Sequence, residues 1–268
     1  MRKTLTSILG TLLICILGFS LVGCGNSEPE SVETIDEAPR YRSPYNFANL
    51  QWGDDGRFYY YIDDKIASRI GIDVSEHNKY IDWDAVATDD VDFAFIRLGN
   101  RGATEGTVNL DDYYNHNIEN AQRVGIDTGV YFFSQALNAD EAREEAEFVL
   151  EQLGSTKLQY PIVFDHEPLP ELNGRADNIS SEALSEAAEA FCDTIKNAGY
   201  DTMIYGNRND VARFEQHIVD DYDFWFAEYN AFAPSGQFDF TIWQYTDGGS
   251  VAGIETSVDM NIHFLEMR

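Results

Sequence analysis

Between residues 70 and 217, short apolar segments alternate with amphipathic segments, and this alternation constrains the fold more than any other feature of the sequence. The apolar segments are rich in β-branched and aromatic residues, which predicts strands. The segments between them carry apolar residues at helical spacing, which predicts helices. Because strand–helix–strand units almost always form right-handed crossovers between parallel strands, we expect a parallel sheet covered by helices.

The alternation yields a specific fold prediction. Strands are expected at residues 70–74, 93–98, 128–133, 160–164, 202–206, 224–227, 241–245 and 257–261. Helices are expected at residues 83–88, 110–124, 139–153, 180–198 and 209–217. Eight strands and five helices in about two hundred residues predict an irregular TIM-like β/α barrel, with few helices in its last third. A doubly wound open sheet is the alternative, but no glycine-rich nucleotide loop follows the first strand.

The N-terminus has the pattern of a lipoprotein signal. Arg2 and Lys3 precede an apolar stretch over residues 5–21, and the sequence LVGC then ends at Cys24. An uncleaved membrane anchor is the alternative, although the stretch is short for a bilayer-spanning helix. We expect residues 1–23 to be a signal peptide and Cys24 to carry lipid, which would anchor the protein to the outer surface of the cell membrane.

Two further segments precede the predicted barrel. Residues 24–45 are polar, acidic and proline-containing, which predicts a disordered linker. Residues 46–69 contain two apolar runs on either side of the turn sequence GDDG, which predicts an aromatic β-hairpin. The barrel is then expected to occupy residues 70–268.

The composition limits the partners of the chain. It has 18 Lys and Arg residues against 47 Asp and Glu residues, a net charge of −29. We therefore expect no nucleic-acid partner, because no basic patch is available to neutralise phosphates. Once Cys15 leaves with the signal and Cys24 carries lipid, Cys192 has no partner for an internal disulfide. No obligate protein partner is evident.

A pair of acids follows one of the predicted strands. The apolar run at residues 160–164 ends in Asp165, His166 and Glu167. In an extended chain Asp165 and Glu167 point the same way, with Cα atoms roughly 6.5–7 Å apart, while His166 points to the other face. Removing a carboxylate from water at the end of a buried strand costs free energy, so two acids at this position indicate a functional role. Two carboxylates in this arrangement could act as acid–base catalysts at the anomeric carbon of a sugar. The alternative interpretation is that the strand simply ends at the surface, where both acids contact water.

Other strand ends also carry polar or aromatic side chains. In a parallel barrel these ends surround one mouth, where active sites lie. The residues concerned are Asp73, Arg97, Tyr131, Asp165, Glu167, Tyr205, Glu228, Tyr229, Trp243, Gln244, Tyr245 and Asp259. Carboxylates can accept hydrogen bonds from hydroxyls and can transfer protons, and aromatic faces can stack on sugar rings. The set therefore predicts an acidic, aromatic, sugar-binding cleft.

Several short motifs resemble those of the family 25 glycoside hydrolases, in the same order. They are GIDVS (71–75), FIRLG (95–99) followed by RG (101–102), GVYFFS (129–134), DHE (165–167), WQY (243–245) and VD (258–259). The resemblance implies an irregular β/α barrel with five helices. It also implies a muramidase (lysozyme) that cuts the β-1,4 bond between N-acetylmuramic acid and N-acetylglucosamine in peptidoglycan, and hence a peptidoglycan glycan strand as partner.

The same resemblance implies roles for individual residues. Glu167 matches the general acid of the family and Asp165 the carboxylate that stabilises the reacting sugar, while Asp73 and Asp259 match two supporting acids. The residues expected to contact substrate are Tyr131, Trp243 and Tyr245, together with Tyr205 and Tyr229 from the strand ends. We expect Asp165 to be ionised while Glu167 is protonated.

Two other functions were considered. A metal-dependent polysaccharide deacetylase could use Asp73, His77, Asp165, His166 and Glu167 as ligands, but alternation should turn His166 away from the acids. A non-catalytic wall-binding lipoprotein is disfavoured because all four acids of the family site are present. We expect no metal and no cofactor.

Overall fold

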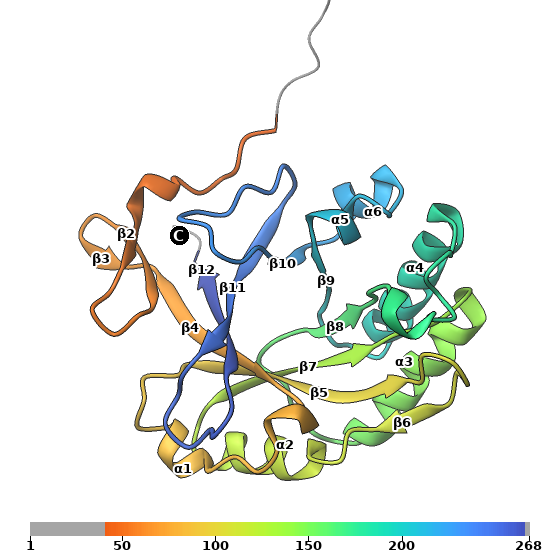
Figure 1. Ribbon diagram of the computed structural model, residues 1–268, viewed down its shortest axis with the longest axis horizontal. Helices are drawn as coiled ribbons and strands as arrows, with labels where there is room; N and C mark the ends of the chain where they lie inside the picture. Colours follow the sequence, from red (N-terminus) through yellow and green to blue (C-terminus); the bar gives the residue numbers. More distant parts are fainter. Residues whose placement is uncertain (1–40, 266–268) are drawn as a thin grey trace, which may run out of the picture. The chain divides into compact units, whose positions relative to one another are not determined.

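The computed structural model describes residues 41–265 of the chain (Figure 1). The predicted signal peptide, the lipidation site Cys24 and most of the predicted linker lie outside the described residues, so these remain predictions. Within residues 41–265, the structure has no helix with the length and apolar character needed to cross a bilayer.

Eight strands form a closed barrel. They are β4 (Ser68–Val74), β5 (Phe93–Arg101), β7 (Asp127–Phe133), β8 (Ile162–Asp165), β9 (Thr202–Asn207), β10 (Phe224–Ala227), β11 (Phe240–Gly249) and β12 (Val258–Phe264). Each strand pairs with the next, and β4 pairs with both β5 and β12, which closes the sheet. A short strand, β6 (Val108–Leu110), extends the sheet as a hairpin on β5. The predicted barrel is confirmed.

The last strand departs from a regular parallel barrel. The strands from β4 to β11 pair in parallel, whereas β12 is antiparallel to both β11 and β4. The loop 250–257 before β12 contains no helix. A parallel return needs a crossover of a dozen or more residues, so β12 reverses direction instead.

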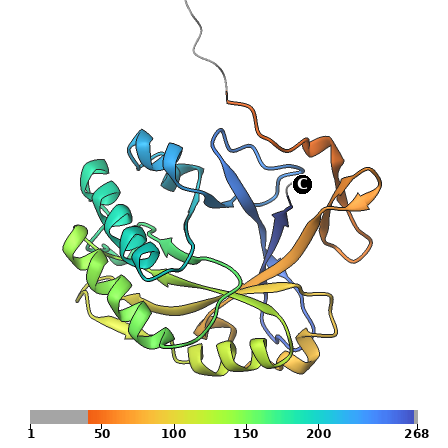
Figure 2. The same cartoon turned by 180° about the vertical axis from the view of Figure 1, so that it is seen from behind.

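Within residues 41–265, six α-helices lie outside the barrel rather than the five expected. They are α1 (Trp83–Val86), α2 (Tyr114–Arg123), α3 (Ala139–Leu153), α4 (Ser181–Asn197), α5 (Arg208–Val211) and α6 (Gln216–Asp221), with 3-10 turns at Phe47–Asn49, Glu76–Asn78 and Pro170–Leu172. The helix predicted at 209–217 is two short helices. Helix α3 begins after Asn138, whose side chain accepts hydrogen bonds from two backbone amides of the first turn. Helices α2, α3 and α4 cover one side of the barrel (Figure 2).

A small antiparallel sheet packs on the opposite side. It consists of β1 (Leu50–Trp52), β2 (Phe58–Ile62) and β3 (Lys65–Ile66), so the predicted hairpin gains a third strand. Its aromatic rings contact the outer face of the barrel: Phe58 lies 5.0 Å from Trp243 and Tyr60 lies 5.4 Å from Phe264, centroid to centroid. These contacts bury the apolar face of β2.

Aromatic rings fill the barrel interior. The ring of Phe95 stacks on Trp225 at 4.6 Å, and that of Phe93 stacks on Tyr160 at 4.3 Å. Gly71 and Gly129 make room for these rings, since a Cβ atom at either position would lie within 2.5 Å of Phe93 or Phe95. Below the mouth the barrel is therefore a packed core.

Candidate active site

The four predicted acids line one cavity at the mouth of the barrel, with a volume of about 710 Å³. Asp73 comes from β4, Asp165 ends β8, and Glu167 follows two residues later. Asp259 comes from the start of β12 and not from a strand end, because β12 runs in the opposite direction. It pairs directly with Asp73, which brings the two side chains to the same face of the sheet.

Two amide side chains hold Asp73 in place. Gln244 Nε2 and Asn261 Nδ2 each donate to Asp73 Oδ2 at 2.8 Å. Burial raises the pKa of Asp73 and these two donors lower it, for a resulting pKa of about 6. Asp73 is therefore an oriented carboxyl group that titrates above its ordinary range.

Glu167 is suited to hold a proton near neutral pH. Burial raises its pKa to about 7, and the charges of Asp210 and Asp259 add to the effect, while Arg213 opposes it. Burial, followed by the charge of Asp73, likewise raises the pKa of Asp259 to about 8. A general acid needs a pKa close to the pH at which the enzyme works, and the raised pKa of Glu167 meets this requirement.

Asp165 is more deeply enclosed than the sequence suggested. Its side chain is buried, and Oδ1 has no hydrogen-bond partner within residues 41–265. Burial, followed by the charge of Glu167, raises the pKa of Asp165 well above its usual range. The ionised state of Asp165 stays a prediction. The two carboxyl groups interact, so they take up and release protons as a pair.

His166, between these acids, points away from the cavity, in agreement with strand alternation. Its Nε2 lies 3.3 Å from the carbonyl oxygen of Ala136, and its Nδ1 lies 3.3 Å from a guanidinium nitrogen of Arg213. Within the described residues, no group of three His, Cys, Asp or Glu side chains is arranged to hold a metal ion. Of the five ligands in the deacetylase alternative, His166 does not line the cavity that contains the other four.

Three of the predicted aromatic contacts, Tyr131, Tyr205 and Tyr229, line the cavity. The hydroxyls of Tyr205 and Tyr229 donate to Gln244 Oε1 at 2.8 and 2.7 Å. Gln244 thus links both rings to Asp73. Sequence analysis predicts no role for Gln244, although strand alternation in WQY indicates that its side chain points inward.

The other two predicted contacts, Trp243 and Tyr245, do not line this cavity, so the prediction that they contact substrate within it needs correction. Alternation along β11 turns both outward when Gln244 turns inward. Trp243 is fully buried, and its Nε1 donates to the carbonyl oxygen of Glu228 at 2.9 Å. The ring of Tyr245 packs 5.2 Å from Phe58 of the small sheet. Both side chains join the barrel to its N-terminal extension.

Two charged residues near the acids were missed. Asp210 lies in α5 and raises the pKa of Glu167 through its charge, while Arg213 follows α5 and lowers it. The Arg213 guanidinium also donates to the carbonyl oxygen of His166 at 3.1 Å. No sequence signal identifies this pair, because its position depends on how α5 packs beside the end of β8.

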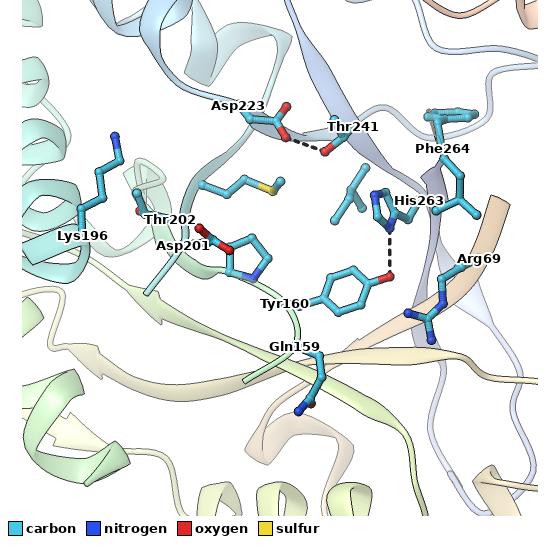
Figure 3. Close-up of a pocket in the computed structure, with 14 residues that line it drawn as sticks. Arg69, Gln159, Tyr160, Lys196, Asp201, Thr202, Asp223, Thr241, His263 and Phe264 are labelled. Carbon is cyan, nitrogen blue, oxygen red and sulfur yellow. Dashed lines mark hydrogen bonds between the residues drawn. The ribbon is translucent and has the colours of Figure 1, made fainter. Parts of the chain in front are cut away.

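A larger cavity, of about 840 Å³, lies at the other end of the barrel (Figure 3). Many of its polar groups are paired: the Tyr160 hydroxyl lies 2.9 Å from His263 Nδ1, and Thr241 donates to Asp223 at 2.5 Å. This end carries the N-terminal ends of the parallel strands, where polar groups usually serve stability. The cavity with the four acids is the better candidate for catalysis.

Similarity to known proteins covers most of the barrel sequence. The model of the family "Glycosyl hydrolases family 25" matches residues 72–254, which include Asp73, Asp165 and Glu167. The autolytic lysozyme of Clostridium acetobutylicum is 29% identical over 191 residues, covering 71% of this chain and 54% of that protein. Lysozyme M1 of Streptomyces globisporus is 29% identical over 201 residues, covering 71% of this chain and 66% of that protein. The chain thus matches about half of the length of the first of these relatives.

A solved structure shares the fold. The modular autolysin LytC of Streptococcus pneumoniae, determined in complex with a synthetic peptidoglycan ligand, superposes with a TM-score of 0.65 at 28% identity. The superposition covers 80% of this chain and 52% of LytC.

Proposed function

Because the chain belongs to glycosyl hydrolase family 25, the lysozyme family, we propose that it is a muramidase acting on peptidoglycan. The bond cleaved is the β-1,4 bond between N-acetylmuramic acid and N-acetylglucosamine. The observation that carries the proposal is the meeting of Asp73, Asp165, Glu167 and Asp259 in one cavity, beside three tyrosines. Acids there can move protons and stabilise charge, and tyrosine rings can stack on sugars.

Glu167 is the general acid in this proposal. A pKa of about 7 leaves a large protonated fraction at neutral pH. The proton passes to the glycosidic oxygen as the bond to the anomeric carbon breaks, which avoids the release of a free alkoxide. The negative charge of Asp210 helps to keep the proton on Glu167 until the substrate takes it.

Asp165 stabilises the positive charge that develops on the reacting sugar. Its pKa is raised in the free protein, but a cation placed beside it favours its ionised form. Ionised Asp165 can then orient the substrate's 2-acetamido group for attack on the anomeric carbon, or activate a water molecule.

Asp73 and Asp259 act as supporting groups. Asp73 is fixed by Gln244 and Asn261, and its charge raises the pKa of Asp259. At neutral pH ionised Asp73 contributes to the negative potential that favours a cationic transition state. Tyr131, Tyr205 and Tyr229 are the proposed sugar contacts.

Peptidoglycan as substrate is supported by the names of two relatives, which are lysozymes, and by the peptidoglycan ligand of LytC. The test is mass spectrometry of the fragments that the full chain releases from purified peptidoglycan. Fragments ending in reducing N-acetylmuramic acid are expected. Reducing N-acetylglucosamine ends, or deacetylated sugars without chain cleavage, would contradict the proposal.

We also propose that lipid on Cys24 keeps the protein at the outer surface of the cell membrane. A net charge of −29 repels anionic wall polymers, so an anchor rather than charge would hold it near its substrate. Cells fed a labelled fatty acid should incorporate label into the wild-type protein and not into a Cys24→Ala variant. Equal labelling of both would refute this assignment.

A further inference from the structure

A second hollow lies on the outer side of β11, where the small N-terminal sheet meets the loop after β10. It has a volume of about 450 Å³ and is lined mainly by Trp52, Phe58, Phe232 and Tyr245, with Asn230 and Thr246. We call it the aromatic groove. From its composition and position, we infer that the aromatic groove binds a neutral amino-sugar residue of the same glycan strand, outside the catalytic cavity.

Two of its aromatic side chains are unusually exposed. Trp52 is 58% exposed and Phe232 is 96% exposed, although neighbouring Phe58 and Tyr245 are buried. The centroid of the Trp52 ring lies 4.6 Å from that of Phe58 and 6.2 Å from that of Tyr245. These two rings support Trp52 on one side, and much of the rest of its surface is exposed. Exposed aromatic surface of this kind commonly marks an interaction site.

The chemistry of the groove suits a sugar better than an ion. Its lining within the described residues contains no charged side chain, in a chain where 24% of residues are charged. Aromatic faces can pack on the C–H faces of a pyranose, and Asn230 and Thr246 can hydrogen-bond to hydroxyl or acetamido groups. An anionic ligand would be repelled by the net charge of −29.

One loop connects the groove to the catalytic cavity. Tyr229 lines the cavity and donates to Gln244, and the next three residues, ending at Phe232, line the groove. The base of this loop is fixed, because Glu228 accepts from the backbone amide and hydroxyl of Ser235. A glycan strand leaving the cavity over Tyr229 would therefore meet Phe232 and then Trp52.

The groove depends on a part of the chain outside the family match. Trp52 and Phe58 belong to the small sheet, whereas the family model begins at residue 72. The N-terminal extension thus adds a binding surface to a barrel that already contains the four acids. The inference rests on the proposed function for the identity of the strand, but not on cleavage.

The test measures binding by the full chain carrying Glu167→Gln, so that cleavage does not interfere. The probes are long peptide-free glycan strands from purified peptidoglycan and the isolated disaccharide unit. Adding Phe232→Ala or Trp52→Ala should lower the ratio of long-strand to disaccharide affinity by about two- to tenfold, the range typical of one aromatic contact. Tyr80→Ala, another exposed aromatic that lines neither hollow, is the matched control and should leave the ratio unchanged.

An unchanged ratio in Phe232→Ala would overturn the inference, because a side chain that is 96% exposed can be removed without loss of folding. The inference also fails if both variants bind long strands normally but lose binding to phosphatidylcholine vesicles, which would identify the groove as a membrane contact. A failure of the proposed function is distinguishable, since it would appear as absent cleavage in the chain with native Glu167.

Discussion

Asp259 of β12 lies directly opposite Asp73 of β4, so two acids from opposite ends of the barrel sequence share one cavity. The reversed direction of β12 produces this pairing, because it brings the start of that strand to the mouth. Burial, followed by the charge of Asp73, raises the pKa of Asp259 to about 8. The way in which the barrel closes therefore contributes to the raised pKa of this acid.

The pH dependence of activity should follow the proton on Glu167. Its folded-state pKa, about 7, lies above its ordinary value, so the active protonated form is lost as the pH rises through 7. We expect kcat/KM to fall with an apparent pKa near 7 on the basic side. Arg213→Met removes a positive charge that lowers this pKa, so the basic limb should move to higher pH, whereas exposed Arg143→Met should not move it. A shift to lower pH in Arg213→Met would contradict the assignment.

Stability should also change with pH in a predictable direction. A carboxyl group whose pKa is raised by folding is protonated in both states below its unfolded pKa and costs stability as the pH rises above it. Glu167→Gln should therefore raise the free energy of unfolding by about 1–3 kcal/mol at pH 8 and by almost nothing at pH 4. Denaturant unfolding at both pH values measures this, with exposed Glu147→Gln as control. A destabilised Glu167→Gln at pH 8 would contradict the electrostatic account.

Gln244 should matter as a positioning residue. Its replacement by alanine removes a donor from Asp73 and the acceptor of Tyr205 and Tyr229. The loss of a hydrogen bond to a charged group costs about 1.5–3 kcal/mol, so we expect kcat/KM to fall about tenfold or more. The pKa of Asp73 should rise, which a carboxyl titration by NMR can detect. If kcat/KM matches that of exposed Gln237→Ala, this role is wrong.

Trp243 should be important for stability, in contrast to its predicted contact with substrate. Because it is fully buried and bonded to Glu228, Trp243→Ala should lower the free energy of unfolding by about 3–5 kcal/mol. Thermal or denaturant unfolding measures the loss. Unchanged stability together with a raised KM would restore the original prediction.

The sequence predicted most of the barrel because alternation between strand and helix is local. Each of the eight predicted strands has a counterpart in the structure. The direction of β12 was not predictable from propensity, since it depends on the loop 250–257 lacking a crossover helix. The split of 209–217 into α5 and α6 also depends on tertiary packing.

Side-chain orientation at the site could be predicted from strand alternation. Alternation correctly separated His166 from Asp165 and Glu167. The same reasoning applied to WQY would have turned Gln244 inward and Trp243 outward. The influence of Asp210 and Arg213 on Glu167 was beyond sequence reasoning, because it arises from the packing of separate elements.

The central claim is that Glu167 supplies the proton that breaks the glycosidic bond. Its most direct test is the rate at which wild type and Glu167→Gln release reducing N-acetylmuramic acid ends from purified peptidoglycan, with folding verified by circular dichroism. Because general acid catalysis contributes about 10²–10⁴-fold, we predict a loss of that size in a folded variant. A folded Glu167→Gln protein that retains near wild-type release would contradict the account.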